Sequence, residues 1–228
     1  MEARDMPQTR ARSGAGNGET GRLVPHFPVH LRGHAAHVDW SLTGLRARLT
    51  GMPDEPSCLA DGSQPATPDD LFQRLQALGI ETTTVRHPPV FTVEEAKLHR
   101  GHIPGVHTKN LFLRNKKDQM WLVVCHQDRT VDLRRLGPAL GSSSRLSFGS
   151  PQRLMRYLGV IPGAVNPFAV INDHQNAVRL VVDSAILGEE PLNFHPLDNA
   201  QTTSITPEDF LRFLKAEEHP PTLISLGA

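Results

Sequence analysis

The sequence predicts an α/β fold: a single domain in which a mixed, largely antiparallel sheet is flanked by helices. Three observations support this prediction. Helical patterns alternate with many short apolar runs of strand length. Two of the helical patterns begin with the same signature, a Thr-Pro pair followed by two acidic residues, which is typical of a helix start. Polar turns join neighbouring strand runs, which is typical of hairpins and therefore of antiparallel pairing.

Length and composition limit the classes of protein to consider. The 228 residues are enough for one domain with an extension, and 24 basic side chains balance 24 acidic ones. Nucleic-acid binding would therefore depend on a local patch. Two cysteines, Cys58 and Cys125, cannot form a disulfide framework. The apolar runs are far shorter than the ~20 residues of a membrane span, and no secretory signal is visible, so we expect a soluble, cytoplasmic protein without membrane contact.

Residues 1–65 differ in composition from the rest of the chain. They are rich in Gly, Pro, Arg and Ser and have little hydrophobic periodicity, which predicts a disordered N-terminal extension and places the domain at residues 66–223. Four histidines between 26 and 37 have near-helical spacing, but prolines interrupt any helix there, so they do not predict a metal site. Met52 lies just before the ordered pattern, which raises the hypothesis that translation starts there.

The first half of the domain combines helices with strands that pair locally. The expected elements are a helix from Thr67 to Gly79, a strand over 80–86, a short helix over 92–99, and strands over 110–114 and 120–125. Thr67 is an N-cap residue, and Pro68 is favoured at the first helical position. A polar turn separates the last two strands, so we expect them to form a hairpin.

The second half continues the alternation. We expect a helix over 133–140, a strand over 146–148, a helix from Ser150 to Leu158, strands over 168–171 and 178–182, a helical turn over 183–187, strands over 192–194 and 202–205, and a last helix after Thr206. Gly159 is the expected stop of the helix that Ser150 begins. The strands over 168–171 and 178–182 are expected to form a second hairpin.

The stretch from Gly159 to Asp173, a Gly- and Pro-rich loop that runs into an apolar strand, is the expected centre of the molecule. Pro162-Gly163 is a strong turn signal, and Asn166-Pro167 disfavours a helical conformation at Asn166. Because Gly163 has no side chain, the backbone there can approach a ligand closely. Taken alone, however, such a loop is more often an ordinary turn between a helix and a strand.

Familiar catalytic motifs are absent from the sequence. It contains no nucleophile elbow, Walker loop, CxxC pair or evident Ser-His-Asp order. A group of histidines lies in loops without tight ligand spacing, so we expect neither a metal nor a cofactor. Its members are His87, His99, His102 and His107.

A few polar residues at strand ends are better candidates for chemistry. Lys109 and Asn110 follow a glycine loop, where a lysine can contact a phosphate or an oxyanion, or simply lie over the sheet edge. His195 follows another strand, although a lone histidine is more often structural. Positive charge gathers in the same region and could guide a phosphate backbone or only solvate a face. Its members are Lys97, Arg100, Arg114, Lys116 and Lys117.

Four ordered stretches within residues 66–223 resemble the free-standing prolyl-tRNA deacylases, relatives of the editing domain of bacterial prolyl-tRNA synthetase in the YbaK/prolyl-tRNA synthetase-associated domain family. The stretches are His-Pro-Pro-Val-Phe-Thr-Val-Glu-Glu-Ala at 87–96, His-Thr-Lys-Asn-Leu-Phe-Leu-Arg at 107–114, Leu-Gly-Val-Ile-Pro-Gly-Ala-Val-Asn-Pro-Phe at 158–168 and Phe-His-Pro-Leu-Asp-Asn at 194–199. Four motifs in order are far more specific than any one of them. Residues 1–65 lie outside the resemblance.

The resemblance implies hydrolysis of mischarged tRNA(Pro), foremost Ala-tRNA(Pro), by a water that the terminal ribose hydroxyl assists, with no metal, cofactor or protein nucleophile. It implies that Lys109 contacts the tRNA 3′ end with Asn110 beside it. Gly163, in the loop that ends at Pro167, would offer backbone groups to the ester, and His195 would line the pocket. Pro167 is counted with the substrate-binding residues. The implied partners are tRNA and prolyl-tRNA synthetase.

A second, smaller site answers a physical problem in proline selection. A pocket sized for proline cannot strongly exclude the smaller alanine, because each methylene contributes only ~1–3 kcal/mol to discrimination. The walls of an editing pocket should therefore be apolar and rigid; the expected ones are Val90, Phe91, Leu111 and Phe168. Pocket size is not readable from the sequence, so a deacylase for seryl- or cysteinyl-tRNA, a non-catalytic tRNA-binding module and a small-molecule-binding domain remain alternatives.

Overall fold

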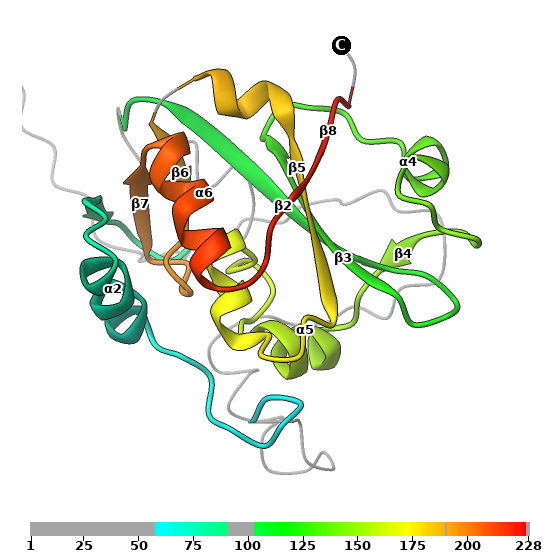
Figure 1. Ribbon diagram of the computed structural model, residues 1–228, viewed down its shortest axis with the longest axis horizontal. Helices are drawn as coiled ribbons and strands as arrows, with labels where there is room; N and C mark the ends of the chain where they lie inside the picture. The colour runs from blue at the N-terminus through cyan, green and yellow to red at the C-terminus, as the bar shows by residue number, and fades with distance from the viewer. Residues whose placement is uncertain (1–57, 91–102, 190, 227–228) are drawn as a thin grey trace, which may run out of the picture. The chain divides into compact units, whose positions relative to one another are not determined.

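The computed structural model describes residues 58–90, 103–189 and 191–226 (Figure 1). Phe91 and the helix expected over 92–99 lie outside these ranges, as do Lys97 and Arg100. Among the helices in the described ranges, none is long and apolar enough to cross a membrane.

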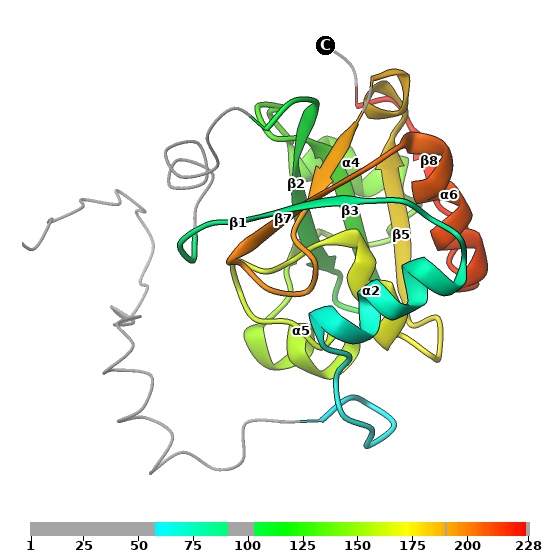
Figure 2. The same cartoon turned by 90° about the vertical axis from the view of Figure 1, so that its left-hand side faces the viewer.

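An eight-stranded mixed sheet forms the centre of the described domain (Figures 1 and 2). Its strands are β1 (Thr83–Arg86), β2 (Val106–Arg114), β3 (Met120–His126), β4 (Ser147–Phe148), β5 (Val178–Asp183), β6 (Leu192–Phe194), β7 (Gln201–Ile205) and β8 (Thr222–Ile224). The order is β1-β7-β6-β2-β3-β5-β8, and β4 pairs with β2 beside this path. The described pairings β1–β7, β6–β7, β2–β3 and β2–β4 are antiparallel, whereas β2–β6, β3–β5 and β5–β8 are parallel. The predicted fold class is confirmed.

Local capping signals set the helix boundaries. The helices are α2 (Pro68–Ala77), α4 (Leu133–Ala139), α5 (Pro151–Leu158) and α6 (Pro207–Ala216), with 3₁₀ helices η1 (Pro167–Asn172) and η2 (Ser184–Gly188). The side chains of Thr67, Ser150 and Thr206 each accept a hydrogen bond from a backbone N–H in the first turn, and a proline follows each of them. Gly159 ends α5 in the left-handed conformation, at φ 64°.

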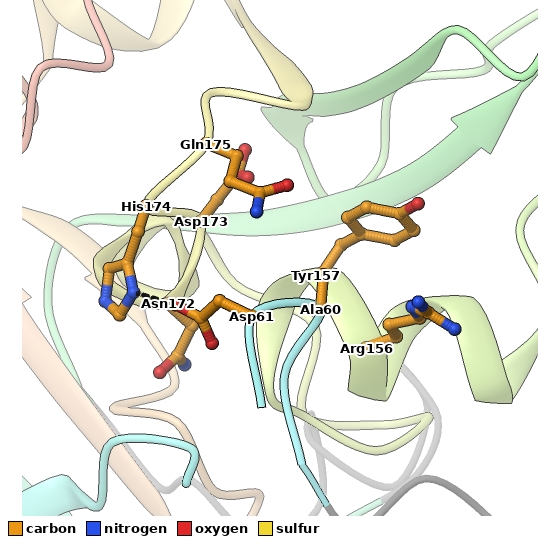
Figure 3. Close-up of a pocket in the computed structure, with 8 residues that line it drawn as sticks. All are labelled: Ala60, Asp61, Arg156, Tyr157, Asn172, Asp173, His174 and Gln175. Atoms are coloured by element: carbon orange, nitrogen blue, oxygen red, sulfur yellow. Dashed lines mark hydrogen bonds and ion pairs between the residues drawn. The ribbon is translucent and has the colours of Figure 1, made fainter. Parts of the chain in front are cut away.

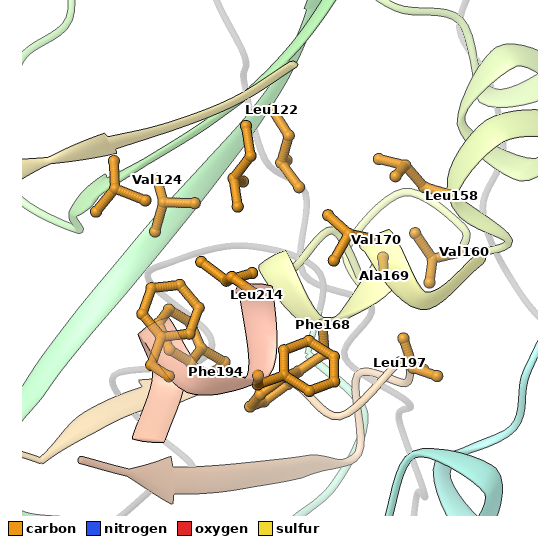
Figure 4. Packing of buried hydrophobic residues seen from close by; sticks show 14 of the residues in the cluster. Leu122, Val124, Leu158, Val160, Phe168, Ala169, Val170, Phe194, Leu197 and Leu214 are labelled. Carbon is orange, nitrogen blue, oxygen red and sulfur yellow. The ribbon is translucent and has the colours of Figure 1, made fainter. Parts of the chain in front are cut away.

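Alternation along the central strands sends side chains to two hydrophobic clusters. Phe112 and Leu122 belong to the larger cluster, which also contains the apolar faces of α2, α5, η1 and α6. Leu113 and Trp121 are the sequence neighbours of these two residues. They belong to a smaller cluster on the other face of the sheet, with Leu136 of α4. Figure 4 shows part of the larger cluster, in which Phe168, Phe194 and Leu214 lie close together. The sheet is therefore covered on both faces.

Three features differ from the sequence prediction. Residues 168–171 were expected as a strand but form η1, because the Asn166 side chain accepts a hydrogen bond from the Ala169 N–H and Pro167 occupies the first helical position. The second hairpin is consequently wrong: β5 pairs in parallel with β3 and with β8, a strand that was not predicted. Contacts also begin before residue 66, since Leu59 is buried and the Ala60 N–H donates to the Arg156 carbonyl.

Candidate functional site at the end of β6

The loop after α5 meets the end of β6 through a histidine. The ring of His195 donates from Nδ1 to the Gly163 carbonyl oxygen over 3.2 Å. Gly163 has φ 90°, in the region that favours glycine, so the turn places its carbonyl toward β6 without a steric penalty. The structure therefore brings together two of the residues that the sequence singled out.

Three consecutive loop carbonyls accept hydrogen bonds from three side chains. Besides the Gly163 carbonyl, the Ala164 carbonyl accepts from Asn166 over 2.7 Å, and the Val165 carbonyl accepts from Asn110 of β2 over 3.0 Å. Asn166 is fully buried, so this bracing is internal to the domain. The loop is fixed to β2 and to β6 at once, which is the rigidity that a substrate-orienting segment needs.

Backbone donors of the same loop are available to a ligand. The Ala164 N–H closes a turn onto the Ile161 carbonyl. Within the described residues, no hydrogen-bond partner is found for the N–H groups of Gly163 or Val165. Such donors beside an imidazole can stabilise negative charge on an oxygen atom.

Burial holds His195 in its neutral form at neutral pH. The side chain is only partly exposed, and this desolvation lowers the pKa of His195 to about 4, with a further contribution from the neighbouring His87. The Gly163 carbonyl and Asp198 act in the opposite direction but do not compensate. Because Nδ1 donates to a carbonyl, the neutral ring keeps a lone pair on Nε2. His195 thus offers a hydrogen-bond acceptor to a substrate hydroxyl or ammonium group.

His87 is a member of the site that sequence reasoning did not assign. Its ring lies 5.9 Å from the ring of His195, centroid to centroid. Nδ1 donates to the Pro88 carbonyl over 2.8 Å, and Nε2 lies 2.9 Å from the Thr202 hydroxyl, from which a neutral ring accepts. In the sequence, His87 was counted among loop histidines without ligand spacing and opens the 87–96 stretch of the resemblance, but it was given no role in the site. Its proximity to His195 depends on the β1–β7 pairing, which no short-range sequence signal specifies.

Lys109 and Asn110 are adjacent in sequence but lie on opposite faces of β2. Asn110 faces the loop, and its Oδ1 is buried without a hydrogen-bond partner among the described residues. Lys109 shares its face with Cys125, and its ammonium donates to the Arg129 carbonyl. The structure thus brings Asn110, Gly163 and His195 together and does not place Lys109 with them.

The four expected pocket walls do not form one surface. Val90 is buried and is hydrogen-bonded to Asn199 through both its N–H and its carbonyl. Leu111 packs against the smaller cluster, whereas Phe168 is fully buried in the larger cluster, on the opposite face. Phe168 has edge-on contacts to two other phenylalanine rings, and Pro167 is buried beside it in η1. Leu111 and Phe168 therefore cannot line a single pocket; Phe91 lies outside the described residues.

A separate small pocket lies near the start of the described chain (Figure 3). Its lining includes Asp61, His174 and Tyr157, and its volume of about 10 Å³ fits about one water molecule. The Asp61 carboxylate accepts from His174 over 2.8 Å, which ties the residues before α2 to the segment before β5. In the described ranges, no group of three His, Cys, Asp or Glu side chains is arranged to hold a metal ion.

The fold and the site together define a small α/β domain that presents a neutral imidazole and backbone donors at the end of a mixed sheet. The chain belongs to the aminoacyl-tRNA editing domain family, whose model matches residues 87–213. That match spans more than half of the chain, and it includes His87, Asn110, Gly163 and His195.

Similar proteins agree with this membership. The mouse prolyl-tRNA synthetase associated domain-containing protein 1 is 43% identical over 160 residues, which are 68% of this chain and 94% of the mouse protein. The prolyl-tRNA editing protein ProX of Acetoanaerobium sticklandii is 39% identical over 148 residues, 64% of this chain and 89% of ProX. A solved structure of a candidate trans-editing enzyme for prolyl-tRNA synthetase shares the fold, with a TM-score of 0.53 at 17% identity, over 70% of this chain and 96% of that one.

Proposed function

We propose that this protein hydrolyses the ester bond of mischarged tRNA(Pro), with Ala-tRNA(Pro) as its preferred substrate. Membership in the editing-domain family supports tRNA as the substrate. The names of the mouse and bacterial relatives connect their proteins with prolyl-tRNA synthetase and prolyl-tRNA editing. Prolyl-tRNA synthetase is therefore the partner that we propose for this chain.

The contact between His195 and the Gly163 carbonyl is the observation that carries this proposal. It fixes the ring so that Nε2 can accept a hydrogen bond from the terminal ribose hydroxyl or from the amino group of the ester. With a pKa of about 4, the ring is a weak base, so its task is to orient rather than to remove a proton. The ribose hydroxyl directs a water to the ester carbonyl, and the N–H groups of Gly163 and Val165 stabilise the oxyanion. The ester C–O bond then breaks, which releases the amino acid and a free tRNA 3′ hydroxyl.

Asn110 supplies a further acceptor beside the loop. Its amide nitrogen is committed to the Val165 carbonyl, so the unpaired Oδ1 is oriented by that bond. An acceptor left without a partner in a buried place costs free energy unless a ligand provides a donor. An amino group or a ribose hydroxyl of the substrate would provide one.

We propose that Lys109 contacts the tRNA 3′ end, although it lies on the other face of β2. Within the described part of the chain, its ammonium donates to one backbone carbonyl, that of Arg129. Releasing one such hydrogen bond costs about 1 kcal/mol, which a phosphate contact can offset. If its role is instead to hold the Arg129 segment, replacing Lys109 will lower stability rather than activity.

The decisive experiment compares deacylation of Ala-tRNA(Pro), Pro-tRNA(Pro), Ser-tRNA and Cys-tRNA(Pro) by the purified protein. We expect selective release of alanine, because a smaller site that admits alanine can reject proline by size. Release of serine or cysteine instead would keep the reaction and replace the substrate. If no ester is hydrolysed while tRNA still binds, the catalytic proposal is wrong and the domain is a binding module.

A Lys109→Ala variant distinguishes between the two proposed roles of this residue. Loss of hydrolysis at an unchanged melting temperature supports the contact to the tRNA 3′ end. Loss of melting temperature at an unchanged rate per folded molecule assigns Lys109 to the Arg129 segment and removes it from the proposed site.

A further inference from the structure

The chain is neutral overall, but positive charge is concentrated at one end of the folded domain. From residue 133 to residue 172 the sequence contains five arginines and no aspartate or glutamate. This segment supplies α4, β4 and α5, and it lies against the turn between β2 and β3, which carries Lys116 and Lys117 (Figure 1). Basic residues are therefore concentrated in this part of the domain.

Direct contacts hold the basic residues together. The Lys116 N–H donates to the Ser144 hydroxyl over 3.2 Å, which sets Arg145 beside the turn. Arg153 of α5 reaches the turn through an ion pair with Asp118 over 2.8 Å, and Arg114 shares the same carboxylate at 3.8 Å. We call this group the basic end; its members are Arg114, Lys116, Lys117, Arg145 and Arg153.

The basic end keeps most of its charge available. Asp118 is the single carboxylate that pairs with it among the described residues, and both of its pairs are with arginines. Lys116, Lys117 and Arg145 are exposed, and no described carboxylate lies within ion-pair distance of them. Exposed cations that merely solvate a face are usually interspersed with acids, which is not the pattern here.

An exposed aromatic ring lies beside the basic end, on the edge of β2 where β4 pairs with it. Phe148 of β4 is 63% exposed and is paired in register with Leu113, while its neighbour Ser147 is paired with Arg114. An aromatic ring beside cations is the arrangement that binds single-stranded nucleic acid, because bases stack on the ring while phosphates meet the cations. Along β2, Asn110 and Arg114 are about 13 Å apart, the length of about four nucleotides at 3.4 Å each.

We propose that the basic end and Phe148 bind the unpaired 3′ end of the tRNA and the phosphates that adjoin it, so that the ester is delivered to His195. This inference rests on the proposed function, since it takes tRNA as the ligand. The 3′ end would pass round the edge of β2, where a base stacks on Phe148 and the adjoining phosphates meet Lys116, Lys117 and Arg145. Neutralised phosphates release counterions, so binding through this surface must weaken as salt rises.

The test uses deacylated tRNA as the probe, with affinity measured by fluorescence anisotropy from about 50 to 200 mM salt, the range over which phosphate contacts are lost. Lys116→Glu should weaken binding at low salt and reduce the slope of log K against log salt by about 1. Lys215→Glu is the matched control, because it is an exposed lysine on α6 with the same change of net charge. Phe148→Ala should weaken binding about tenfold with little change in salt slope.

A second arm separates this proposal from the catalytic one. The alanyl ester of adenosine lacks the phosphates, so Lys116→Glu should hydrolyse it at the wild-type rate while its KM for Ala-tRNA(Pro) rises. Equal tRNA affinity and equal salt slopes for Lys116→Glu and Lys215→Glu would overturn the proposal. The basic residues would then contact an acidic partner or only solvent. If the wild type hydrolyses neither substrate, the catalytic proposal fails, and the binding arm still decides the role of the basic end.

Discussion

Two histidines with little solvent exposure, His195 and His219, are shifted in opposite directions from their ordinary pKa. Burial lowers the pKa of His195 to about 4. Burial acts in the same direction on His219, but the hydrogen bond to the Asp173 carboxylate and the Glu217 carbonyl outweigh it, so the pKa of His219 is raised. The difference therefore comes from the partners and not from the depth of burial.

Geometry gives the two rings different protonation states. Nε2 of His219 lies 3.1 Å from a carboxylate oxygen of Asp173, and Nδ1 lies 2.7 Å from the Glu217 carbonyl. Both neighbours are acceptors, so both nitrogens of His219 carry a proton. Among the described residues, His195 has an acceptor at Nδ1 alone, the Gly163 carbonyl. One ring is a cation that fastens the end of α6 to the segment before β5, and the other is a neutral acceptor at the candidate site.

The largest expected effect separates the two rings by function. His195→Ala should lower kcat/KM for Ala-tRNA(Pro) by about 10³-fold, or about 4 kcal/mol of transition-state stabilisation, because the orienting acceptor is lost. His219→Ala should leave the rate per folded molecule unchanged and lower the melting temperature. Single-turnover deacylation and thermal unfolding of both variants check this contrast. Equal losses of rate in both would contradict the separation.

The second effect concerns the carboxylate of the His219 pair. Asp173 also accepts hydrogen bonds from the N–H groups of Ala177 and Val178. Asp173→Asn keeps the size of the side chain but leaves the buried imidazolium without its counter-charge. The free energy of unfolding, measured in urea, should therefore fall by about 3 kcal/mol. Asp61→Asn is the control, since it weakens the exposed pair with His174 (Figure 3) and should change stability much less. A comparable loss in both variants would reject a special role for burial.

The third effect is a dependence of stability on pH with opposite signs. His195 binds its proton less readily when folded, so its contribution to stability falls as pH drops from about 6.5 toward about 4. His219 binds its proton more readily when folded, so its contribution is present below the unfolded pKa and is lost as pH rises through its raised pKa. Melting temperatures measured from about pH 4 to beyond the raised pKa of His219 should show that His195→Gln flattens the acid side and His219→Gln the alkaline side. The assignment is wrong if each substitution flattens the opposite side.

Local signals made most of the fold predictable from the sequence. Thr67, Ser150 and Thr206 each precede a proline, and all three begin helices where expected. The strand over 168–171 was wrong because Asn166-Pro167 has two physical interpretations. It disfavours a helical conformation at Asn166 itself, and it also caps a helix that starts at the proline. The N-cap interpretation holds here.

Long-range pairing limited the prediction of the site. The motif residues Asn110, Gly163 and His195 were named from the sequence, and the structure brings them together. The opposite orientations of Lys109 and Asn110 follow from strand alternation once β2 is known to begin at Val106, upstream of the predicted start. The position of His87 depends on the β1–β7 register, and that register is set by the tertiary fold rather than by local sequence.

The smallest effect tests whether His87 supports His195. Thr202 is buried, and its hydroxyl hydrogen-bonds Nε2 of His87 over 2.9 Å. Thr202→Val removes that hydrogen bond, which lowers the stability of the protein by about 1 kcal/mol. It also frees the His87 ring that lies beside His195, so deacylation should slow about fivefold. Thr203→Val is the matched control on the same strand, because its buried hydroxyl pairs with Thr84 instead. A similar loss of stability in both variants, with a slower rate in Thr202→Val alone, identifies His87 as a positioning residue; equal rates would confine it to the structure of the sheet edge.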